Sequence, residues 1–416
     1  MKNRNGLFLL LSFLICFGAR GQAPADSLKV RVPDILLDSA DYGFTVQGFD
    51  LIAYGGRLSF NKEGAPVWDK RIILAGRNGD VRQVIEIQKL GKKFAKDWRK
   101  GAVLNISLSG KEKKMYVLMR DMGTLTPEYL LIYDLKESQG RFVRLKLKLK
   151  GKHYKILSSG AGFFYDEKSR QFYIPVIERK KLEGLYGECP EFFRDQHSLG
   201  VFSSSGRLLR LMAPYSRLYR EGPCLYDFRS VSLSADKEQR VLGIQEMLNP
   251  QLRFFDLDTG LPLTRDTTKA RAVEIFTSRK EELLWPLHDY LVNPLYYGLR
   301  YDSLNSLWLR EYKPPLPDTL KKADPEFEYF IDEYLAGRIK SCPAVSPEKE
   351  ERQARLQNAP RFYQLLNRNG EIMGQLKWKN AGYYASEKGA IWLMRSKNWK
   401  EKGYFMIYRF PLEAFQ

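Results

Sequence analysis

The sequence predicts an all-β protein, and two recurring patterns support that prediction. The first is an apolar, aromatic-rich run, an aspartate, a short polar turn and a second apolar run, as in Phe163–Tyr173 and Leu299–Leu309. Each copy is typical of two antiparallel strands joined by a tight turn. The second is an apolar pair, polar residues and a glycine, at 201–206, 254–260 and 365–370. Glycine there supplies the positive φ that such turns often need.

Degenerate copies of the hairpin recur along the chain. The predicted hairpins lie at 103–119, 161–177, 229–245, 296–310 and 380–395. Each is followed by one further strand, in turn at 129–134, 199–203, 252–256, 362–367 and 404–410. An earlier unit covers 49–87, with strands at 50–54 and 81–87.

These six units predict a β-propeller with six blades, with seven blades as the alternative. A four-stranded blade with its loops takes about 40–50 residues, so the wider spacing here requires long loops. The segment 27–37 is expected to add a strand to the last blade and close the ring. An open sheet or solenoid is the other alternative, but it would leave long aromatic edges exposed.

One interval does not resemble a blade and is predicted to be an insertion, at 313–360, within a single domain that spans 22–416. It opens with the proline-rich linker Lys313–Asp318, and apolar residues follow at helical spacing in 325–340. A small helical insertion near 318–358 is therefore expected, either capping one face of the disc or packing on its outer wall.

Residues 1–21 are predicted to be a signal peptide. Lys2 and Arg4 precede an apolar run, and small residues before Gln22 suit signal peptidase. Removal of this segment takes away three cations and no acid, which lowers the formal net charge from +19 to +16. The run is too short to span a bilayer, and no second apolar stretch approaches that length. The mature chain is thus expected in the periplasm, outside the cell or at the outer-membrane surface.

The cysteines suit an oxidising compartment but define no metal site. The mature chain has three, which permit one disulfide in three pairings, and the favoured pair is Cys189 with Cys224. No CxxC pair or Cys/His cluster is present, so neither zinc nor another cofactor is expected. Lipidation at Cys16 is disfavoured because Ile15 stands where a lipoprotein has a small residue.

The chain resembles a known group of proteins in three features. They are a signal peptide that ends in Gly21–Gln22, aromatic blades with Tyr-Asp turns, and the Tyr296–Asp302 unit followed by a proline-rich helical insert. Together they resemble the uncharacterised, secreted six-bladed propellers of Bacteroidota, of the TolB-like kind, over most of 30–412. The resemblance implies a propeller in the cell envelope, but no catalytic residue comes with it.

Catalytic signals are sparse, since the chain has no HExxH, GxSxG or P-loop motif. The densest polar cluster contains Glu191, Asp195 and His197, which suit acid–base work or a bound cation. His288 and Asp289 form a second candidate that would face the central channel. The alternative interpretations are a solvated blade loop for the first cluster and a hydrogen-bonded structural histidine for the second.

The most distinctive polar feature is the basic segment, Arg144–Lys150, in which cations and leucines alternate strictly. On a strand its leucines face the core, while Arg144, Lys146, Lys148 and Lys150 face water about 7 Å apart. Such a row suits a polyanion, although lysines on an exposed edge also simply prevent edge pairing. Because export makes nucleic acid an improbable physiological ligand, a sulfated or uronate glycan or the anionic outer membrane is favoured.

These observations favour a non-enzymatic, monomeric envelope propeller that binds a partner protein or an anionic polysaccharide. The alternative is a glycan-active hydrolase or lyase with its site on the propeller axis. The two hypotheses differ in whether carboxylates, histidine and arginine converge at the axis, because glycosidases need a pair of carboxyl groups there.

Overall fold

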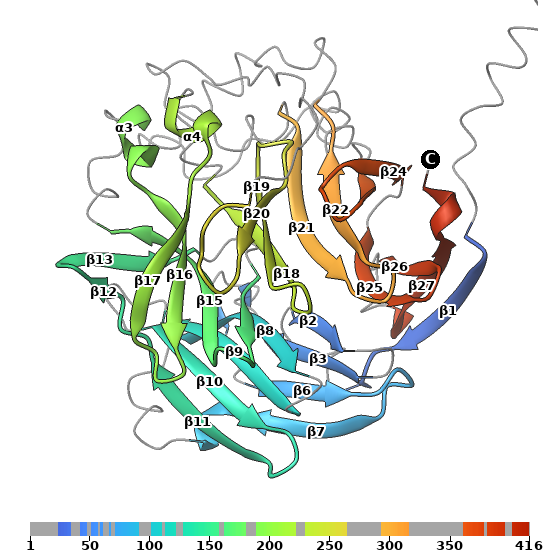
Figure 1. The fold of residues 1–416 in the computed structure, drawn as a ribbon. Coiled ribbons are helices and arrows are strands. Elements are labelled where there is room, and N and C mark those ends of the chain that lie inside the picture. The colour runs from blue at the N-terminus through green and yellow to red at the C-terminus, as the bar shows by residue number, and fades with distance from the viewer. Residues whose placement is uncertain are drawn as a thin grey trace, which may run out of the picture.

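Six small antiparallel sheets are arranged in a ring, so the chain forms a six-bladed β-propeller (Figure 1). This confirms the predicted fold class and excludes the seven-bladed alternative. The structure is a computed structural model. It describes residues 24–34, 42–47, 51–56, 59–60, 66–67, 71–90, 101–109, 113–121, 128–157, 162–179, 189–221, 229–263, 293–315, 361–377, 381–395 and 402–415.

The first three blades follow the chain from its N-terminal part. Blade 1 contains β2 (Tyr42–Gln47), β3 (Leu51–Gly56), β6 (Arg71–Ala75) and β7 (Val81–Glu86). Blade 2 contains β8 (Gly101–Ser109), β9 (Lys114–Asp121), β10 (Glu128–Asp134) and β11 (Gln139–Arg144). Blade 3 contains β14 (Phe164–Asp166), β15 (Gln171–Glu178), β16 (His197–Ser203) and β17 (Leu208–Pro214), extended by β12 (Lys148–Leu149) and β13 (Lys152–Ile156).

The last three blades complete the ring. Blade 4 contains β18 (Val231–Asp236), β19 (Val241–Glu246) and β20 (Arg253–Asp256). Blade 5 contains β21 (Leu295–Asp302), β22 (Leu307–Lys313), β23 (Phe362–Leu366) and β24 (Ile372–Lys377). Blade 6 contains β25 (Ala381–Glu387), β26 (Ala390–Arg395), β27 (Tyr404–Pro411) and β1 (Asp26–Arg31). A separate pair, β4 (Ser59–Phe60) with β5 (Pro66–Val67), lies between β3 and β6.

The first strands of the blades surround the centre of the ring. Contacts join β25 to β2, β2 to β8, β8 to β14 and β18 to β21. All five predicted hairpins and the strands expected after them are present, within three residues of their predicted ends.

The N-terminal strand closes the ring, as expected from its sequence. β1 pairs antiparallel with β27, from Asp26 opposite Arg409 to Arg31 opposite Tyr404. Val30 is fully buried in a cluster that also holds residues of blade 1. The backbone N–H of Arg31 donates to the carbonyl of Arg77, which ties blade 6 to blade 1. Both ends of the described chain therefore lie in one blade.

Apolar side chains on the blade faces form the core between neighbouring blades. Between blades 2 and 3, the ring of Tyr116 meets that of Phe172 edge-on, with 5.3 Å between centroids. Between blades 4 and 5, Trp308 packs against Gly243, where an added Cβ would lie 2.6 Å from the indole. The high aromatic content thus fills the wedge-shaped spaces between blades.

The two faces of the disc differ in their connections. On one face of the disc, tight turns join the first strand of a blade to the second and the third to the fourth. On the other face, longer connections join the second strand to the third and one blade to the next. The longer connections include α3 (Cys189–Arg194) and α4 (Arg217–Glu221), at the top of Figure 1, which the sequence did not predict. The predicted insertion connects β22 to β23, which pair in one sheet. Its helical character concerns 316–360, which lie outside the described residues.

An aspartate at the strand end organises the tight turns. The carboxylate of Asp166 accepts hydrogen bonds from the backbone N–H and hydroxyl of Ser169, and Asp134, Asp236 and Asp302 accept similar bonds in their own turns. The last turn residue has positive φ, for example 53° at Arg170. These bonds explain why the sequence repeats aspartate there, because its side chain replaces missing backbone partners.

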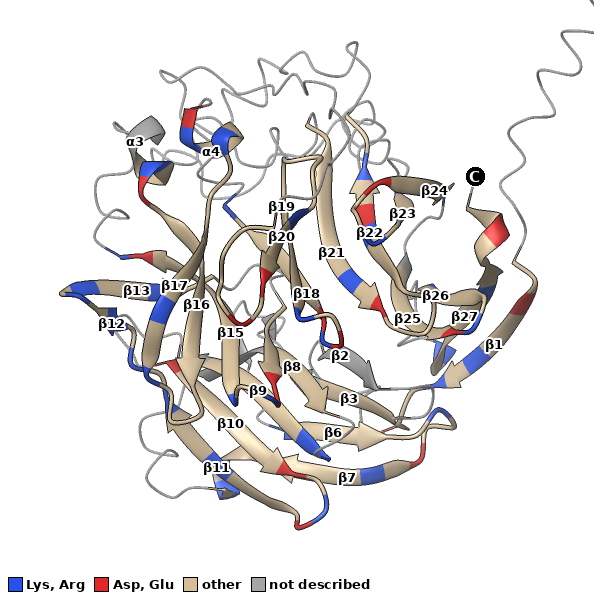
Figure 2. Ribbon diagram, viewed as in Figure 1, with Lys and Arg blue, Asp and Glu red and all other residues tan. Residues whose placement is uncertain are grey.

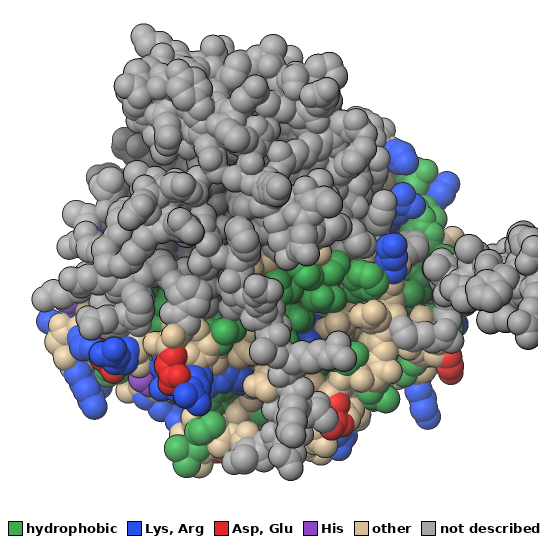
Figure 3. Space-filling model, turned by 90° about the horizontal axis from the view of Figure 1, so that it is seen from above, with side chains coloured by type: hydrophobic (Ala, Val, Ile, Leu, Met, Phe, Trp, Pro, Cys, Tyr) green, Lys and Arg blue, Asp and Glu red, His purple; other side chains and the backbone are tan. Residues whose placement is uncertain are grey.

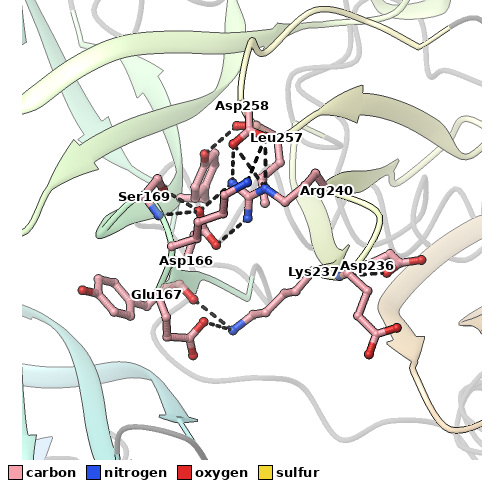
Figure 4. A network of polar contacts seen from close by, with 12 residues as sticks. Asp166, Glu167, Ser169, Asp236, Lys237, Arg240, Leu257 and Asp258 are labelled. Carbon is pink, nitrogen blue, oxygen red and sulfur yellow. Dashed lines mark hydrogen bonds and ion pairs between the residues drawn. The ribbon is translucent and has the colours of Figure 1, made fainter.

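The same turns also connect neighbouring blades (Figure 4). Asp166, 1% exposed, forms two parallel hydrogen bonds of 2.7 and 2.8 Å with the guanidinium of Arg240. Arg240 also bonds the carboxylate of Asp258, and Lys237 pairs with Glu167 at 2.7 Å. Burial alone would raise the pKa of Asp166, but the hydrogen bonds from Arg240 and Ser169 lower it to about 2.

We expect substitution at the positive-φ turn position to stabilise the protein. Arg170 is exposed, and its φ of 53° is unfavourable for a residue with a Cβ. Arg170→Gly should therefore raise the free energy of unfolding by roughly 0.5–1 kcal/mol, after the entropy cost of glycine is subtracted. Lys168→Gly in the same turn is the matched control and should destabilise. Urea denaturation checks both, and equal effects would contradict the explanation.

We also expect Asp166 to contribute to acid denaturation. Its native pKa of about 2 lies below the ordinary value of about 3.9. Its stabilisation is therefore complete above about pH 4 and is lost as the pH falls toward 2. Asp166→Asn should cost about 2 kcal/mol at pH 6 and much less at pH 2, in urea titrations at each pH.

Asp258→Asn is the control for this pair, because its carboxylate is about half exposed. It should cost less than about 1 kcal/mol at pH 6. A difference between wild type and Asp166→Asn that stays constant from pH 2 to pH 6 would contradict the assignment.

Candidate functional site

The basic segment connects two blades and is not one continuous strand, which corrects the prediction. β11 ends at Arg144, Lys146 forms an isolated bridge with Arg207, and β12 contains only Lys148 and Leu149. The backbone changes partner along this path, because the chain leaves the outer strand of blade 2 and enters blade 3. Leu145 N–H donates to the carbonyl of Glu128, and Lys146 N–H donates to that of Gly206.

The predicted alternation of exposure holds along this irregular path. Leu145 is 3% exposed, and Leu147 and Leu149 pack half-buried against the same apolar cluster. The four cations of the basic segment are all exposed. None of these cations has an acidic partner within the part of the chain that the structure describes. The segment therefore presents charge that no described side chain neutralises.

A second strand widens this surface into the basic hairpin, residues 144–155. β12 pairs with β13 through the turn Lys150–Gly151, which places His153 directly opposite Lys148. His153 and Lys155 are exposed, while Tyr154 and Ile156 are buried. From 139 to 157 the sequence contains seven lysines and arginines and no acid.

The charges of the basic hairpin lie at one edge of the disc. Figure 2 shows lysines and arginines along β12, β13 and the adjoining part of β17, and Figure 3 shows blue side chains at the same edge. The charge of Lys152 is compensated, because its ammonium pairs with buried Glu178 at 3.1 Å. Like charges that face each other across strands are destabilising, so the hairpin is stabilised by its buried leucines and not by its surface.

Gly206 determines how closely the backbone of the basic segment approaches blade 3. Its carbonyl accepts the 2.7 Å hydrogen bond from Lys146 N–H, and its φ is +80°. A Cβ there would lie 2.5 Å from the carbonyl oxygen of Arg144. Glycine therefore permits close approach of the two backbones and sets where the cations stand.

One predicted catalytic cluster lies next to the hairpin. Asp195 is exposed, and His197 begins β16 half-buried, with its Nδ1 lacking a hydrogen-bond partner. Burial lowers the pKa of His197, against an opposing effect of Asp195. These residues are at the third strand of blade 3, away from β14 at the centre of the ring. The side chain of Glu191, in α3, is outside the described residues.

The other candidates are not tested by the structure. His288, Asp289 and Cys224 lie outside the described residues, as does the side chain of Cys189, so the disulfide remains a prediction. Among the described residues, no group of three or more His, Cys, Asp or Glu side chains is placed to hold a metal ion. No helix in the described part is long and apolar enough to cross a membrane.

Sequence reasoning missed two parts of this region. It did not predict that β13 adds His153 and Lys155 to the basic segment, although the acid-free stretch from 139 to 157 signals it. It also missed the role of Gly206, because the contact with Arg144 joins residues far apart in the chain. Only the exposure alternation was visible in the local pattern.

Comparison with known proteins shows the fold. No protein-family model matches the chain, and no curated protein matches it in sequence. A solved member of the DUF4221 family from Bacteroides vulgatus is similar, with a TM-score of 0.59, 12% identity, and coverage of 93% of this chain and 96% of that chain. A putative exported protein from Bacteroides fragilis has a TM-score of 0.43, 7% identity, and coverage of 94% and 97%.

We expect Gly206→Ala to displace the basic segment without changing its charge. The added methyl group meets backbone on one side and positive φ strains it, so unfolding should become easier by about 2 kcal/mol or more. Gly151→Ala is the matched control, because Gly151 also has positive φ but nothing within 4 Å of an added Cβ. It should cost only about 1 kcal/mol. Similar losses in thermal or urea unfolding would contradict the packing argument.

Proposed function

We propose that this protein is an exported, non-enzymatic binding module of the bacterial cell envelope, and that its basic hairpin contacts an anionic polysaccharide. The observation that carries the proposal is the exposed row of Arg144, Lys146, Lys148 and Lys150, which lacks acidic partners among the described residues. The resemblance to secreted propellers of Bacteroidota, of the TolB-like kind, and the predicted signal peptide support an envelope location.

The geometry suits a linear polyanion. Four exposed cations follow one another at every second residue along the path from β11 into the turn after β12, and the paired strand β13 adds His153 beside them. Binding to exposed cations gains free energy from released counterions and falls with salt. A sulfated or uronate chain offers regular charge without requiring a closed pocket, so the hairpin needs no deep cavity.

The test replaces Lys146, Lys148 and Lys150 together with glutamine. Stability should change little, because surface substitutions usually stay within about 0.5 kcal/mol each. Affinity for heparin or polygalacturonate should fall at least tenfold, and the dependence of log K on log salt should flatten by about 2. Calorimetric titration at several salt concentrations measures both quantities.

The matched control is the triple variant Lys377→Gln, Lys388→Gln and Lys402→Gln, which removes the same charge from exposed positions on blades 5 and 6. It should retain the affinity and most of the salt slope. If both triple variants bind alike, the polymer responds to net charge and not to the hairpin. If the first variant binds as wild type does, the hairpin is an ordinary solvated edge.

A further inference from the structure

Blade 5 carries charged side chains on a sheet face where a propeller normally places apolar ones. Glu311 stands in the middle strand β22, with Tyr297 opposite it on β21 and Tyr363 opposite it on β23. The next inward-facing residue on β22 is Lys313, which is only 7% exposed. The face therefore places a half-buried acid next to a buried lysine.

The apolar part of the same face ends just before these residues. Leu309 and Leu365 pack in one cluster with Ile391, Leu393 and Phe410 of blade 6. Beyond Leu309 the face becomes polar, in the direction of the long connections. Blades 5 and 6 are thus sealed by apolar contacts at one end and lined by polar groups at the other.

The fold makes room for the carboxyl group of Glu311. The register of β21 against β22 shifts between Tyr297 and Arg300, which marks a β-bulge. Gly298 lies in this bulge with φ of +63°, and a Cβ there would be 2.9 Å from Glu311 Oε1. Bulges commonly re-aim a side chain near a functional site. Here the bulge and its glycine leave a space that the carboxyl group enters.

Cations surround this carboxyl group without forming an ion pair with it. Arg300 stacks over the ring of Tyr383 in blade 6 at 4.9 Å, and exposed Arg361 lies 5.9 Å from the ring centre of Tyr297. Among the described residues, no lysine or arginine nitrogen lies within 4.0 Å of the Glu311 oxygens. Arginines held by aromatic stacking keep their N–H donors available for a ligand.

We propose that this face is a binding site for a small carboxylate, of the uronic acid class, between blades 5 and 6. Arg361 and Arg300 bind the ligand carboxylate, and Glu311 donates a hydrogen bond to it in its protonated form. The hydroxyl group of half-buried Tyr297 suits a sugar hydroxyl. The site goes beyond the basic hairpin, which lies on blades 2 and 3 and binds polymer by surface charge.

The charge balance favours an anion over a cation. Among the described residues, the two exposed arginines Arg300 and Arg361 share the face with one acid, Glu311. Burial, together with the nearby charge of Arg361, lowers the pKa of Lys313 to about 8. A bound carboxylate would compensate this excess of positive charge, whereas a cationic ligand would add to it.

The protonation state of Glu311 links the site to pH. Burial raises the pKa of Glu311 to about 7, against the lowering effects of Arg361, the Tyr363 hydrogen bond and Arg300. The charged or titratable groups that face it are therefore Tyr297 and Arg300 from β21, and Arg361 and Tyr363 at β23. Because an anion binds better beside a neutral carboxyl group, affinity should fall as the pH rises through 7.

The experiment titrates the mature protein with sodium glucuronate by calorimetry at pH 6 and pH 8, with glucose and inorganic phosphate as comparison ligands. Wild type should bind glucuronate about tenfold more tightly at pH 6, because a group with a pKa of about 7 loses most of its protons over this interval. Glucose should bind at least tenfold more weakly. Phosphate binding equal to glucuronate binding would overturn the uronate assignment.

Two variants separate the contribution of Glu311 to the pH dependence from that of Arg361 to the affinity. Glu311→Gln keeps a hydrogen-bond donor and cannot ionise, so it should retain affinity at pH 6 and lose most of the pH dependence, leaving at most the roughly twofold change that Lys313 can cause by pH 8. Arg361→Gln changes an exposed side chain and should bind at least tenfold more weakly at both pH values. Wild type that does not bind glucuronate, an Arg361→Gln variant that binds normally, or a Glu311→Gln variant with unchanged pH dependence would each overturn the proposal.

A further comparison keeps this site distinct from the proposed polymer site. The Lys146, Lys148 and Lys150 triple variant should bind glucuronate as wild type does, since the hairpin is on other blades. Loss of glucuronate binding in that variant would overturn the assignment to blade 5. Urea midpoints of Arg361→Gln and Glu311→Gln show whether each variant is folded. If Glu311→Gln does not fold, glucuronate binding by Arg361→Gln alone decides whether the proposal holds.

Discussion

The pairing of β1 with β27 is the constraint on which the rest of the structure depends. A propeller blade buries both faces only when it has a neighbour on each side, so an open ring would expose one face of blade 1 and one of blade 6. Val30 shows this dependence directly, because it belongs to the last sheet yet packs in a cluster with Ile52 and Ile73 of blade 1. Joining the two ends of the chain in one sheet also makes separation of the terminal blades break six residue pairs at once. Unpaired edge strands are a liability, and the pairing with β1 covers the edge that β27 would otherwise expose.

The two faces of the disc differ in how strongly their residues are constrained by contacts between blades. On the face of the tight turns, inter-blade contacts such as Asp166 with Arg240 use buried, bidentate charge pairs, which specify geometry strongly. Those contacts leave little freedom for change. The opposite ends of the strands lead into longer connections, where sequence can vary at small cost in closure entropy. Glu311 and Lys313 lie toward that second end of blade 5, where the apolar contacts with blade 6 stop, and a ligand site is more easily accommodated there than among the turns.

The fold was predictable from the sequence because its signals are local. The aspartate that ends Phe164–Asp166 and the positive-φ residue at Arg170 act within one turn, so each hairpin is visible in a dozen residues. The exposure alternation of the basic segment is equally local. Contacts between distant residues were not predictable, such as Gly206 against Arg144 or Asp166 with Arg240. Blade 5 shows a second difficulty: Arg310 and Glu311 face opposite sides of a strand that is buried on both, so no alternation marks either residue. Arg310 donates hydrogen bonds to the side-chain amides of Gln245 and Gln364. These partners come from neighbouring strands, so the local sequence around Arg310 does not reveal them.

The two proposed anion sites differ in dielectric environment, and this difference determines how each responds to conditions. Charges on the basic hairpin are exposed, so salt screens them over about 10 Å at 0.1 M ionic strength. In the site on blade 5, Glu311 is half-buried between Tyr297 and Tyr363, and its protonation depends on these surroundings. Salt therefore modulates the first site and pH the second. The export proposed above would expose the protein to changes in both salt and pH, and the two proposed sites lie on different blades.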